Sequence, residues 1–336
     1  MRIAVLSPVA WRTPPRHYGP WEQVALNITE GLVNLGHEVT LFATGDSQTS
    51  ARLEAICDTG YEEDRSQDAK VLECLHIAHL MEQSSRFDII HNNFDFLPLT
   101  YSRFIATPMV TTIHGFSSPR IIPVYKKYNA GSHYVSISNS DRSDELIYAA
   151  TVYNGLKTEE FIFNDKPQDY LLFFGRIHPH KGTADAISIA KKSGRKLIIA
   201  GIIQDEHYFN TEVKPYLDDE QIRYIGHAGP EKRRELLANA YALLHPIFFD
   251  EPFGMSVAEA MLCGTPVIAY NRGSMPELID NGRTGFLVHN KHEAVDALNE
   301  LSTLNRSDCH AWANAHFTQE KMVADYVKVY EKVLSR

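Results

Sequence analysis

Short apolar runs alternate with stretches of helical periodicity along almost the whole chain, and this alternation constrains the fold more than any other feature. Such a pattern favours parallel strands with helices packed on both faces of each sheet. The sequence therefore predicts an α/β protein. Strands are expected at 3–6, 39–42, 89–90, 109–113, 134–137, 170–174, 197–200, 222–225, 242–244, 266–269 and 285–288.

The length of the chain, 336 residues, suits two domains of ordinary size. The strand–helix rhythm occurs twice, which predicts a first Rossmann-like domain over residues 1–160 and a second over 166–316. The polar stretch 164–169 is the expected linker. Helical patterns include 21–35, 71–81, 141–149, 183–193, 255–261 and 319–334.

Composition and charge narrow the classes of function. The formal net charge of −9 argues against a general nucleic-acid binder, which needs a basic face. The basic run 232–234 is expected to be a solvated helix face. No apolar run approaches the roughly 20 residues of a spanning helix, and residues 1–6 continue directly into a strand rather than a secretory cleavage site.

The four cysteines are scattered, with no closely spaced pair, so no zinc ribbon, redox motif or disulfide framework is expected. Together with the lack of a signal segment, this pattern predicts a cytoplasmic location.

The stretch from Glu251 to Glu259 places two carboxylates around the start of a helix. Pro252 and Gly254 suit a tight turn, and the helical pattern begins at Met255. Carboxylates accept hydrogen bonds from sugar diols, and the free N–H groups of a helix start attract anions. A sugar nucleotide carries both kinds of group, so this stretch predicts a site for such a ligand.

A glycine-bounded loop upstream indicates the same ligand. Arg176 and Lys181 lie between the expected strand 170–174 and the helical pattern that begins at Thr183. Arginine offers a planar fork of donors and lysine a mobile point charge, a combination that suits a diphosphate. The loop lacks the Gly-Lys-Ser/Thr of a nucleoside triphosphatase. The alternative to a diphosphate site is a solvated basic loop, and the glutamates downstream make this alternative less favoured.

The basic loop with Arg176 and Lys181, followed by two glutamates separated by seven residues, resembles the retaining glycosyltransferases of the large group 1 family, of the family four type. The resemblance covers nearly the whole chain. It implies the GT-B fold, in which two Rossmann-like domains with parallel sheets face each other across a cleft. The first domain is then expected to take the acceptor and the second the nucleotide-sugar donor. A C-terminal helix over 317–336 is expected to cross back to the first domain.

The resemblance also implies roles for individual residues. Arg176 and Lys181 are expected to neutralise the leaving diphosphate, Glu251 to bind hydroxyls of the transferred sugar, and Glu259 to bind the ribose diol. Backbone around Gly226 is expected to face the nucleobase. The predicted donor site comprises Gly19, Arg176, Lys181, Gly226, Glu251, Phe253, Gly254, Met255, Ser256 and Glu259.

Loops of the first domain supply the remaining candidates. Gly19 resembles the first glycine of the family's Gly-Gly turn, but Pro20 stands in the second position and lacks an N–H donor. A plain helix start is the alternative. His114 ends a strand where family members carry a histidine that contacts the transferred sugar, and a histidine bonded to backbone is the alternative. His114 joins Glu251, Arg176 and Lys181 as the catalytic candidates. Tyr18, His91 and Asn92 are the acceptor-site candidates.

These observations predict retaining transfer of a hexosyl group from a nucleotide-diphosphate sugar, with a UDP-sugar favoured over a GDP-sugar, to a hydroxyl acceptor. The acceptor class stays open among small molecules, glycans and lipid-linked species. No Asp-x-Asp motif stands out, so neither a metal nor a cofactor is expected. A nucleotide-sugar epimerase of the same architecture is the alternative. A nicotinamide dehydrogenase is disfavoured because no Gly-x-Gly-x-x-Gly follows the first strand.

Overall fold

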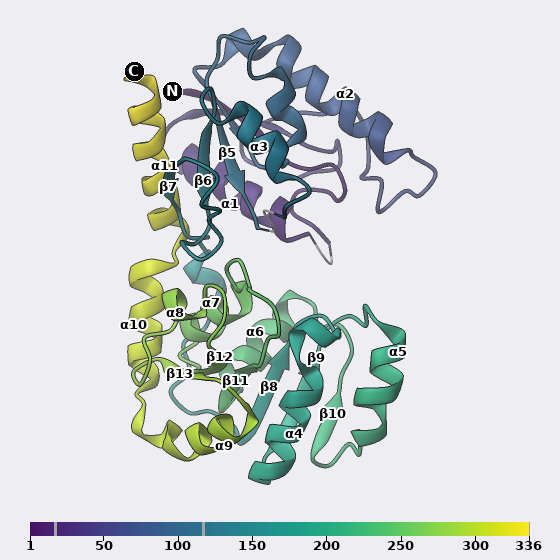
Figure 1. The fold of residues 1–336 in the computed structure, drawn as a ribbon, viewed down its shortest axis with the longest axis vertical. Helices are drawn as coiled ribbons and strands as arrows, with labels where there is room; N and C mark the ends of the chain where they lie inside the picture. The colour runs from purple at the N-terminus through teal and green to yellow at the C-terminus, as the bar shows by residue number, and fades with distance from the viewer. Residues whose placement is uncertain (17–18, 116–117, 336) are drawn as a thin grey trace. The chain divides into compact units, whose positions relative to one another are not determined.

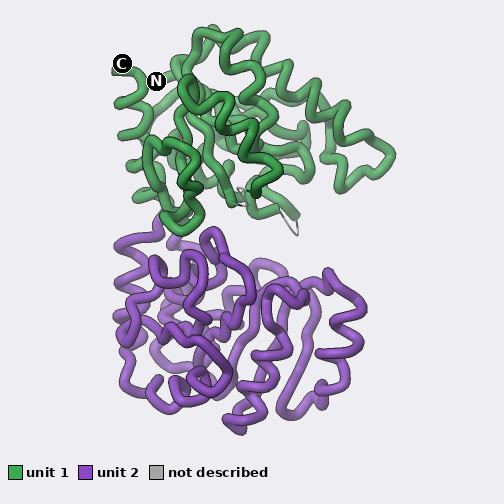
Figure 2. The backbone as a smooth tube through the Cα atoms, in the orientation of Figure 1, with its two compact units in different colours: residues 1–156, 319–336 green, residues 157–318 purple. Residues whose placement is uncertain are grey.

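The computed structural model describes residues 1–16, 19–115 and 118–335. Its chain divides into two compact units, the first of residues 1–156 with 319–336 and the second of residues 157–318 (Figure 2). Each unit is built around one sheet of parallel strands (Figure 1). The predicted α/β class is therefore confirmed. Among the described residues, no helix is both long enough and apolar enough to cross a membrane.

The sheet of the first unit has seven strands in the order β3-β2-β1-β4-β5-β6-β7. Its central strands are buried along almost their whole length because helices cover both faces. Ile3, for example, pairs in register with Val39 on one side and Ile89 on the other. The strands are β1 (Arg2–Leu6), β2 (Glu38–Phe42), β3 (Arg52–Glu54), β4 (Ile89–Asn92), β5 (Met109–Ile113), β6 (His133–Ser136) and β7 (Tyr148–Thr151).

Two helices from opposite ends of the chain pack together on one face of this sheet. Helix α1 (Pro20–Asn34) begins at a proline, which suits the first helical position, and α11 (Gln319–Leu334) lies against it. A Cβ added at Gly31 would lie 2.5 Å from Val323 Cγ2, so glycine allows the close approach of the two helices. The other face is covered by α2 (Ala69–Glu82) and α3 (Ile122–Tyr128).

The helix predicted at 141–149 is wrong. This segment forms turns in which the side chain of Ser138 accepts from Asp141 N–H and that of Ser143 accepts from Glu145 N–H. Such local side-chain bonds compete with helix formation. Strands β3 and β7 at the sheet edges were not predicted, because short edge strands have little apolar pattern of their own. The start of the predicted linker, 164–169, is bonded to the second unit, because Asn164 N–H donates to Cys263 O at 3.1 Å.

The sheet of the second unit has six strands in the order β10-β9-β8-β11-β12-β13. They are β8 (Tyr170–Phe174), β9 (Lys196–Ala200), β10 (Ile222–Tyr224), β11 (Ala242–His245), β12 (Val267–Tyr270) and β13 (Gly285–Val288). The α-helices are α4 (Thr183–Ser193), α5 (Glu206–Tyr208), α6 (Pro230–Asn239), α7 (Met255–Leu262), α8 (Met275–Leu278), α9 (Lys291–Glu300) and α10 (Arg306–His316). A buried apolar cluster runs between the sheet, α4 and α9.

Candidate functional site

The strand order of the second unit brings two loops together. The chain leaves β8 towards β9 and β10 and then returns to β11 on the other side of β8. Ligands of open α/β sheets bind beyond the carboxyl ends of the strands at such a switch point. A backbone hydrogen bond joins the loops after β8 and β11, in which Phe248 N–H donates to His180 O at 2.7 Å. Gly182 adopts a φ of 73°, and a Cβ there would lie 1.9 Å from Pro246 O.

Lys181 and Glu251 meet where these loops touch. The ammonium of Lys181 donates to Oε2 of Glu251, and each side chain is only 14% exposed. His245, the last residue of β11, places Nε2 3.6 Å from the same carboxylate oxygen. The Lys181 ammonium also lies 4.8 Å from the centre of the Phe249 ring. Two of the predicted residues therefore meet in one cluster, together with His245, which no sequence pattern indicated.

Burial and charge act in opposite directions on this cluster. Burial raises the pKa of Glu251, but His245 and Lys181 outweigh it, and the pKa falls to about 2. Burial lowers the pKa of His245 despite the opposing effect of Glu251. At neutral pH the cluster therefore contains a charged carboxylate beside a neutral imidazole.

Arg176 is held on the β9 side of its loop. Gly175 N–H donates to Ala200 O, and Ile177 N–H donates to Ile202 O at 2.8 Å, so the β8–β9 pairing continues into the loop. The guanidinium of Arg176 donates to the side-chain oxygen of Gln204. The two residues predicted to bind the diphosphate, Arg176 and Lys181, thus lie at opposite ends of the loop, with Lys181 beside β11.

The start of α7 lies next to the Glu251 side chain. Gly254 caps this helix with a φ of 87°, and a Cβ built on it would lie 3.6 Å from Cγ of Glu251. Met255 and Ser256 follow in the first turn, where N–H groups have no intrahelical acceptor. The Phe253 ring is buried and packs edge-to-face on Phe317 at 5.8 Å. The ring of Phe253, predicted for the donor site, is therefore packed inside the second unit.

Glu259 faces a different helix. It is buried on α7, and its Oε1 lies 3.3 Å from Nη1 of Arg233 on α6. Burial raises the pKa of Glu259, and Arg233 opposes this effect. The prediction that 232–234 is a wholly solvated face is wrong for Arg233. Arg233 precedes the buried Leu237 by four residues and so shares the helix face that packs inwards.

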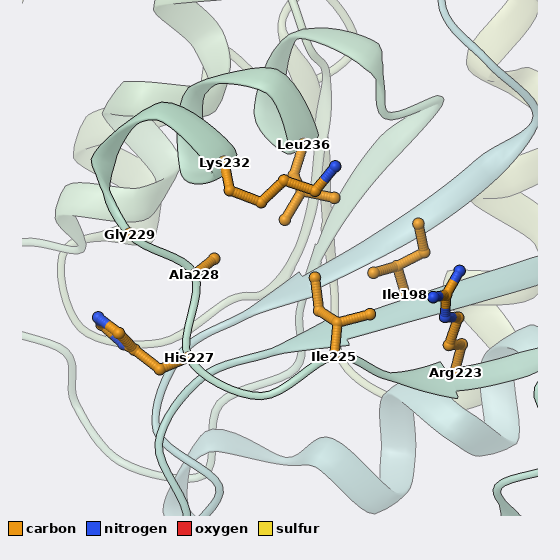
Figure 3. A pocket seen from close by; sticks show the side chains of 8 residues that line it. All are labelled: Ile198, Arg223, Ile225, His227, Ala228, Gly229, Lys232 and Leu236. Atoms are coloured by element: carbon orange, nitrogen blue, oxygen red, sulfur yellow. The ribbon is translucent and has the colours of Figure 1, made fainter.

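Gly226 follows β10 with a φ of 76°, and its carbonyl accepts from Gly201 N–H at 2.9 Å. The residues after it pass beside a cavity of about 260 Å³ on the α6 side (Figure 3). In Figure 3, Lys232 and Arg223 extend from α6 and β10 on either side of apolar side chains, while His227 points away from them. The cavity is lined by Ile198, Arg223, Ile225, His227, Ala228, Gly229, Lys232 and Leu236.

In the first unit, His114 lies just beyond β5. It is buried, its ring stacks on Trp21 with centroids 5.6 Å apart, and its Nε2 lies 3.0 Å from Oδ1 of Asn93. Burial lowers the pKa of His114 to about 3, so the imidazole is neutral at neutral pH. The side-chain nitrogen of Asn93 is buried without a hydrogen-bond partner. Asn93 therefore has an unused donor beside His114.

The structure does not support His91 and Asn92 as acceptor ligands. Both are fully buried, and the two ring nitrogens of His91 lie 2.8 Å from Thr112 Oγ1 and 2.6 Å from the Tyr330 hydroxyl. The side chain of Asn92 donates to Asp95 O at 2.7 Å and accepts from a nearby backbone N–H. The polar atoms of His91 and Asn92 therefore bond to groups inside the first unit, as buried polar side chains usually do.

Gly19 caps the start of α1, with a φ of 155°. A Cβ there would lie 2.8 Å from both Pro15 Cβ and Oε2 of Glu22, so a larger residue would displace this turn. Tyr18, predicted for the acceptor site, lies outside the described residues.

Two Rossmann-like units, with a lysine–glutamate cluster at the switch point of the second, define a protein of the GT-B class. The profile of the family described as "Glycosyl transferases group 1" matches residues 157–318, and that of "Glycosyltransferase Family 4" matches residues 21–147. The chain belongs to the group 1 glycosyltransferases.

Similar proteins agree with this assignment. An uncharacterized glycosyltransferase of Methanocaldococcus jannaschii is 23% identical over 87% of this chain and 86% of its own length. Glycogen synthase of Mycobacterium tuberculosis is 24% identical over 85% of this chain and 81% of its own length. The crystal structure of Anabaena HepE in complex with UDP and glucose superposes with a TM-score of 0.76 at 18% identity, covering 99% of this chain and 100% of HepE. These comparisons favour a transferase over the epimerase alternative.

Proposed function

We propose that this chain transfers a hexosyl group from a UDP-sugar, with a GDP-sugar as the second candidate, to a hydroxyl acceptor with retention of configuration and without a divalent cation. The contact between Lys181 and Glu251 carries the proposal, because it places a cation for a diphosphate beside a carboxylate for sugar hydroxyls. The preference for UDP is supported by HepE, whose crystal structures contain UDP-glucose or UDP with glucose.

The leaving diphosphate is stabilised by the basic loop. Lys181 has three N–H donors, of which one bonds Glu251, and the others are available to phosphate oxygens. Arg176 adds a planar fork of donors at the other end of the loop. The first N–H groups of α7, at Met255 and Ser256, attract the same negative charge. Because this charge grows in the transition state, fixed positive groups lower the barrier without help from a metal.

Glu251 acts as a hydrogen-bond acceptor rather than as a base. A carboxyl group with a pKa of about 2 stays ionised and holds a proton too weakly for efficient base catalysis at neutral pH. It is suited to hold hydroxyls of the transferred sugar. The acceptor hydroxyl therefore gives its proton to the leaving phosphate oxygen on the same face of the sugar. The bond from the anomeric carbon to phosphate breaks there, and the bond to the acceptor oxygen forms.

The direct test is glycosyl transfer from a panel of sugar nucleotides. Binding is screened first by thermal unfolding, since a ligand at 100 times its Kd adds about 2.7 kcal/mol of stability. With the donor known, Glu251→Gln and Lys181→Met are expected to lower kcat by orders of magnitude, whereas Lys192→Met, at the exposed end of α4, leaves it unchanged. NMR of the product reads the anomeric configuration.

Three results would contradict the proposal. The first is a wild-type rate in either site variant. The second is loss of activity on treatment with EDTA that Mg²⁺ or Mn²⁺ restores, and the third is an inverted product. Epimerised donor formed without any acceptor would instead support the epimerase.

A further inference from the structure

One face of the first unit combines exposed apolar side chains with a run of cations. Phe104 is 85% exposed and Ile147 is 73% exposed. The sequence from 96 to 140 contains four Arg or Lys residues and no Asp or Glu, although acidic residues outnumber basic ones by 42 to 33 in the whole chain. The segment 96–140 therefore departs locally from the acidic balance of the chain, whereas Ile147 follows a short stretch, 141–145, that contains three Asp or Glu residues.

Contacts between the segments bring these residues close together around the end of α3. Nη2 of Arg103 donates to Lys127 O at 3.1 Å, and both cations lie over the ring of Tyr128, at 5.6 and 5.4 Å from its centre. Asn129, which follows α3, accepts a hydrogen bond from Ile147 N–H at 3.0 Å. The exposed hydrophobic residues thus flank the C-terminal end of α3, a helix on the outside of the unit (Figure 1). We call the set Arg103, Phe104, Lys126, Lys127 and Ile147 the Phe104 face.

We propose that the Phe104 face docks on the surface of an anionic lipid bilayer. Exposed aromatic and aliphatic side chains enter the boundary between headgroups and acyl chains, and lysine and arginine beside them attract anionic headgroups. Lys126 pairs at 2.7 Å with Glu145, and both side chains are more than half exposed, so solvent and lipid headgroups can compete for the lysine.

The composition of the face favours lipid over a protein partner. Stable protein interfaces have a continuous apolar core from which lysine is depleted. Here, the exposed apolar side chains Phe104 and Ile147 are separated by Lys127, Tyr128 and Asn129, and two of the five members of the face are lysines. Mobile cations between separate apolar anchors suit a fluid surface of negative charge.

The test is sedimentation of the full chain with vesicles, and it does not depend on glycosyl transfer. The chain is expected to sediment with mixed phosphatidylcholine–phosphatidylglycerol vesicles, to stay in solution with phosphatidylcholine alone, and to be released by salt. Arg103→Gln and Lys127→Gln are each expected to weaken partitioning by about fivefold, and Phe104→Ser to weaken it at least as much.

Two variants of the second unit are matched controls. Lys191 lies over the ring of Tyr216 at 4.8 Å from its centre, a contact of the same kind as that of Lys127 with Tyr128 at 5.4 Å, and Ile162 is 72% exposed. Lys191→Gln and Ile162→Ser are expected to partition like the wild type. Thermal unfolding of every variant shows that its fold is kept.

Equal sedimentation with neutral and anionic vesicles would overturn the proposal, and so would losses of the same size in the controls. Dimerisation of the wild type without lipid, abolished by Phe104→Ser in analytical ultracentrifugation, would assign the face to a second copy of the chain and also refute lipid docking. Because no outcome involves transfer activity, this test stands apart from that of the proposed reaction.

Discussion

Replacing Lys181 with methionine is the sharpest test of the site cluster. Methionine keeps most of the length of the side chain but leaves Glu251 buried beside a neutral His245. Removing one partner of a buried ion pair costs about 3–5 kcal/mol. The pKa of Glu251 falls from its ordinary 4.5 to about 2, which corresponds to about 3 kcal/mol at neutral pH. Because His245 contributes part of that stabilisation and remains in the variant, we expect Lys181→Met to lower the free energy of unfolding by about 3 kcal/mol, the lower end of this range.

The pH dependence of this loss follows from the sign of the pKa change. A carboxyl group whose pKa is lowered by folding stabilises the protein above its unfolded pKa, and this contribution is lost as the pH falls towards the folded value. In Lys181→Met, burial acts on Glu251 without the lysine, so the carboxyl group protonates at a higher pH than in the wild type. The stability gap between wild type and variant is therefore expected to be widest at neutral pH and to narrow as the pH is lowered towards 4.

The assay must follow the second unit alone, because a chain of two units does not unfold in one step. Trp312 lies in α10 of the second unit, whereas the other two tryptophans lie in the first. In a Trp11→Phe/Trp21→Phe background, urea unfolding followed by Trp312 fluorescence reports the second unit. With a slope of about 2 kcal/mol per molar urea, the midpoint should fall by roughly 1.5 M at pH 7.

Arg283→Met is the matched control, because it removes exposed ion pairs to Asp280 and Asp308 in the same unit. Its midpoint is expected to change by less than about 0.5 M. A Lys181→Met shift no larger than that of the control, or one that is the same at pH 7 and pH 4, would refute the electrostatic reasoning.

Three further substitutions test the surrounding structure. Gly182→Ala places a methyl group where it would meet Pro246 O at 1.9 Å, so it should force the two loops apart and abolish the thermal shift given by the donor; a wild-type shift would contradict this. Tyr330→Phe leaves Nδ1 of His91 without its partner and should cost about 1–3 kcal/mol in chemical unfolding of the first unit; no cost would show that the bond is unimportant. Glu259→Gln removes a buried charge whose pKa is raised by burial, and it leaves a partner, Arg233, that is 30% exposed to solvent, so stability at pH 7 should change by less than about 1 kcal/mol. Its affinity for UDP-sugar in calorimetry should nevertheless fall, and an unchanged affinity would contradict the ribose-binding role.

The secondary structure was predictable where local pattern and burial agree. Strand β8 and helix α11 have the bounds expected from their apolar periodicity, 170–174 and 319–334. The failure at 141–149 has a local cause, since serine side chains bond the backbone and hold turns. Edge strands such as β7 were missed because their pairing depends on a neighbour that is distant in sequence.

The candidate site was predictable only in part. Lys181 and Glu251 were assigned to one ligand from their residue types and family resemblance, and the structure joins them in one ion pair. His245 and Arg233 had to be seen in the structure, because nothing in a strand-end histidine or a basic run reveals which carboxylate it faces. His91 was predicted to bind the acceptor, but both of its ring nitrogens lie within hydrogen-bond distance of buried partners, Thr112 and Tyr330.

The α/β class, the loops that follow the strands, and the polar chemistry of those loops could all be predicted from the amino-acid order. These properties depend on periodicity and residue type over short stretches, where each residue contacts its neighbours in the chain. The folded chain was needed to show which polar groups bond to buried partners and which meet at the switch point of the second sheet. That choice depends on strand order and burial, which arise from contacts between residues tens or hundreds of positions apart, such as His91 with Tyr330 or Lys181 with Glu251.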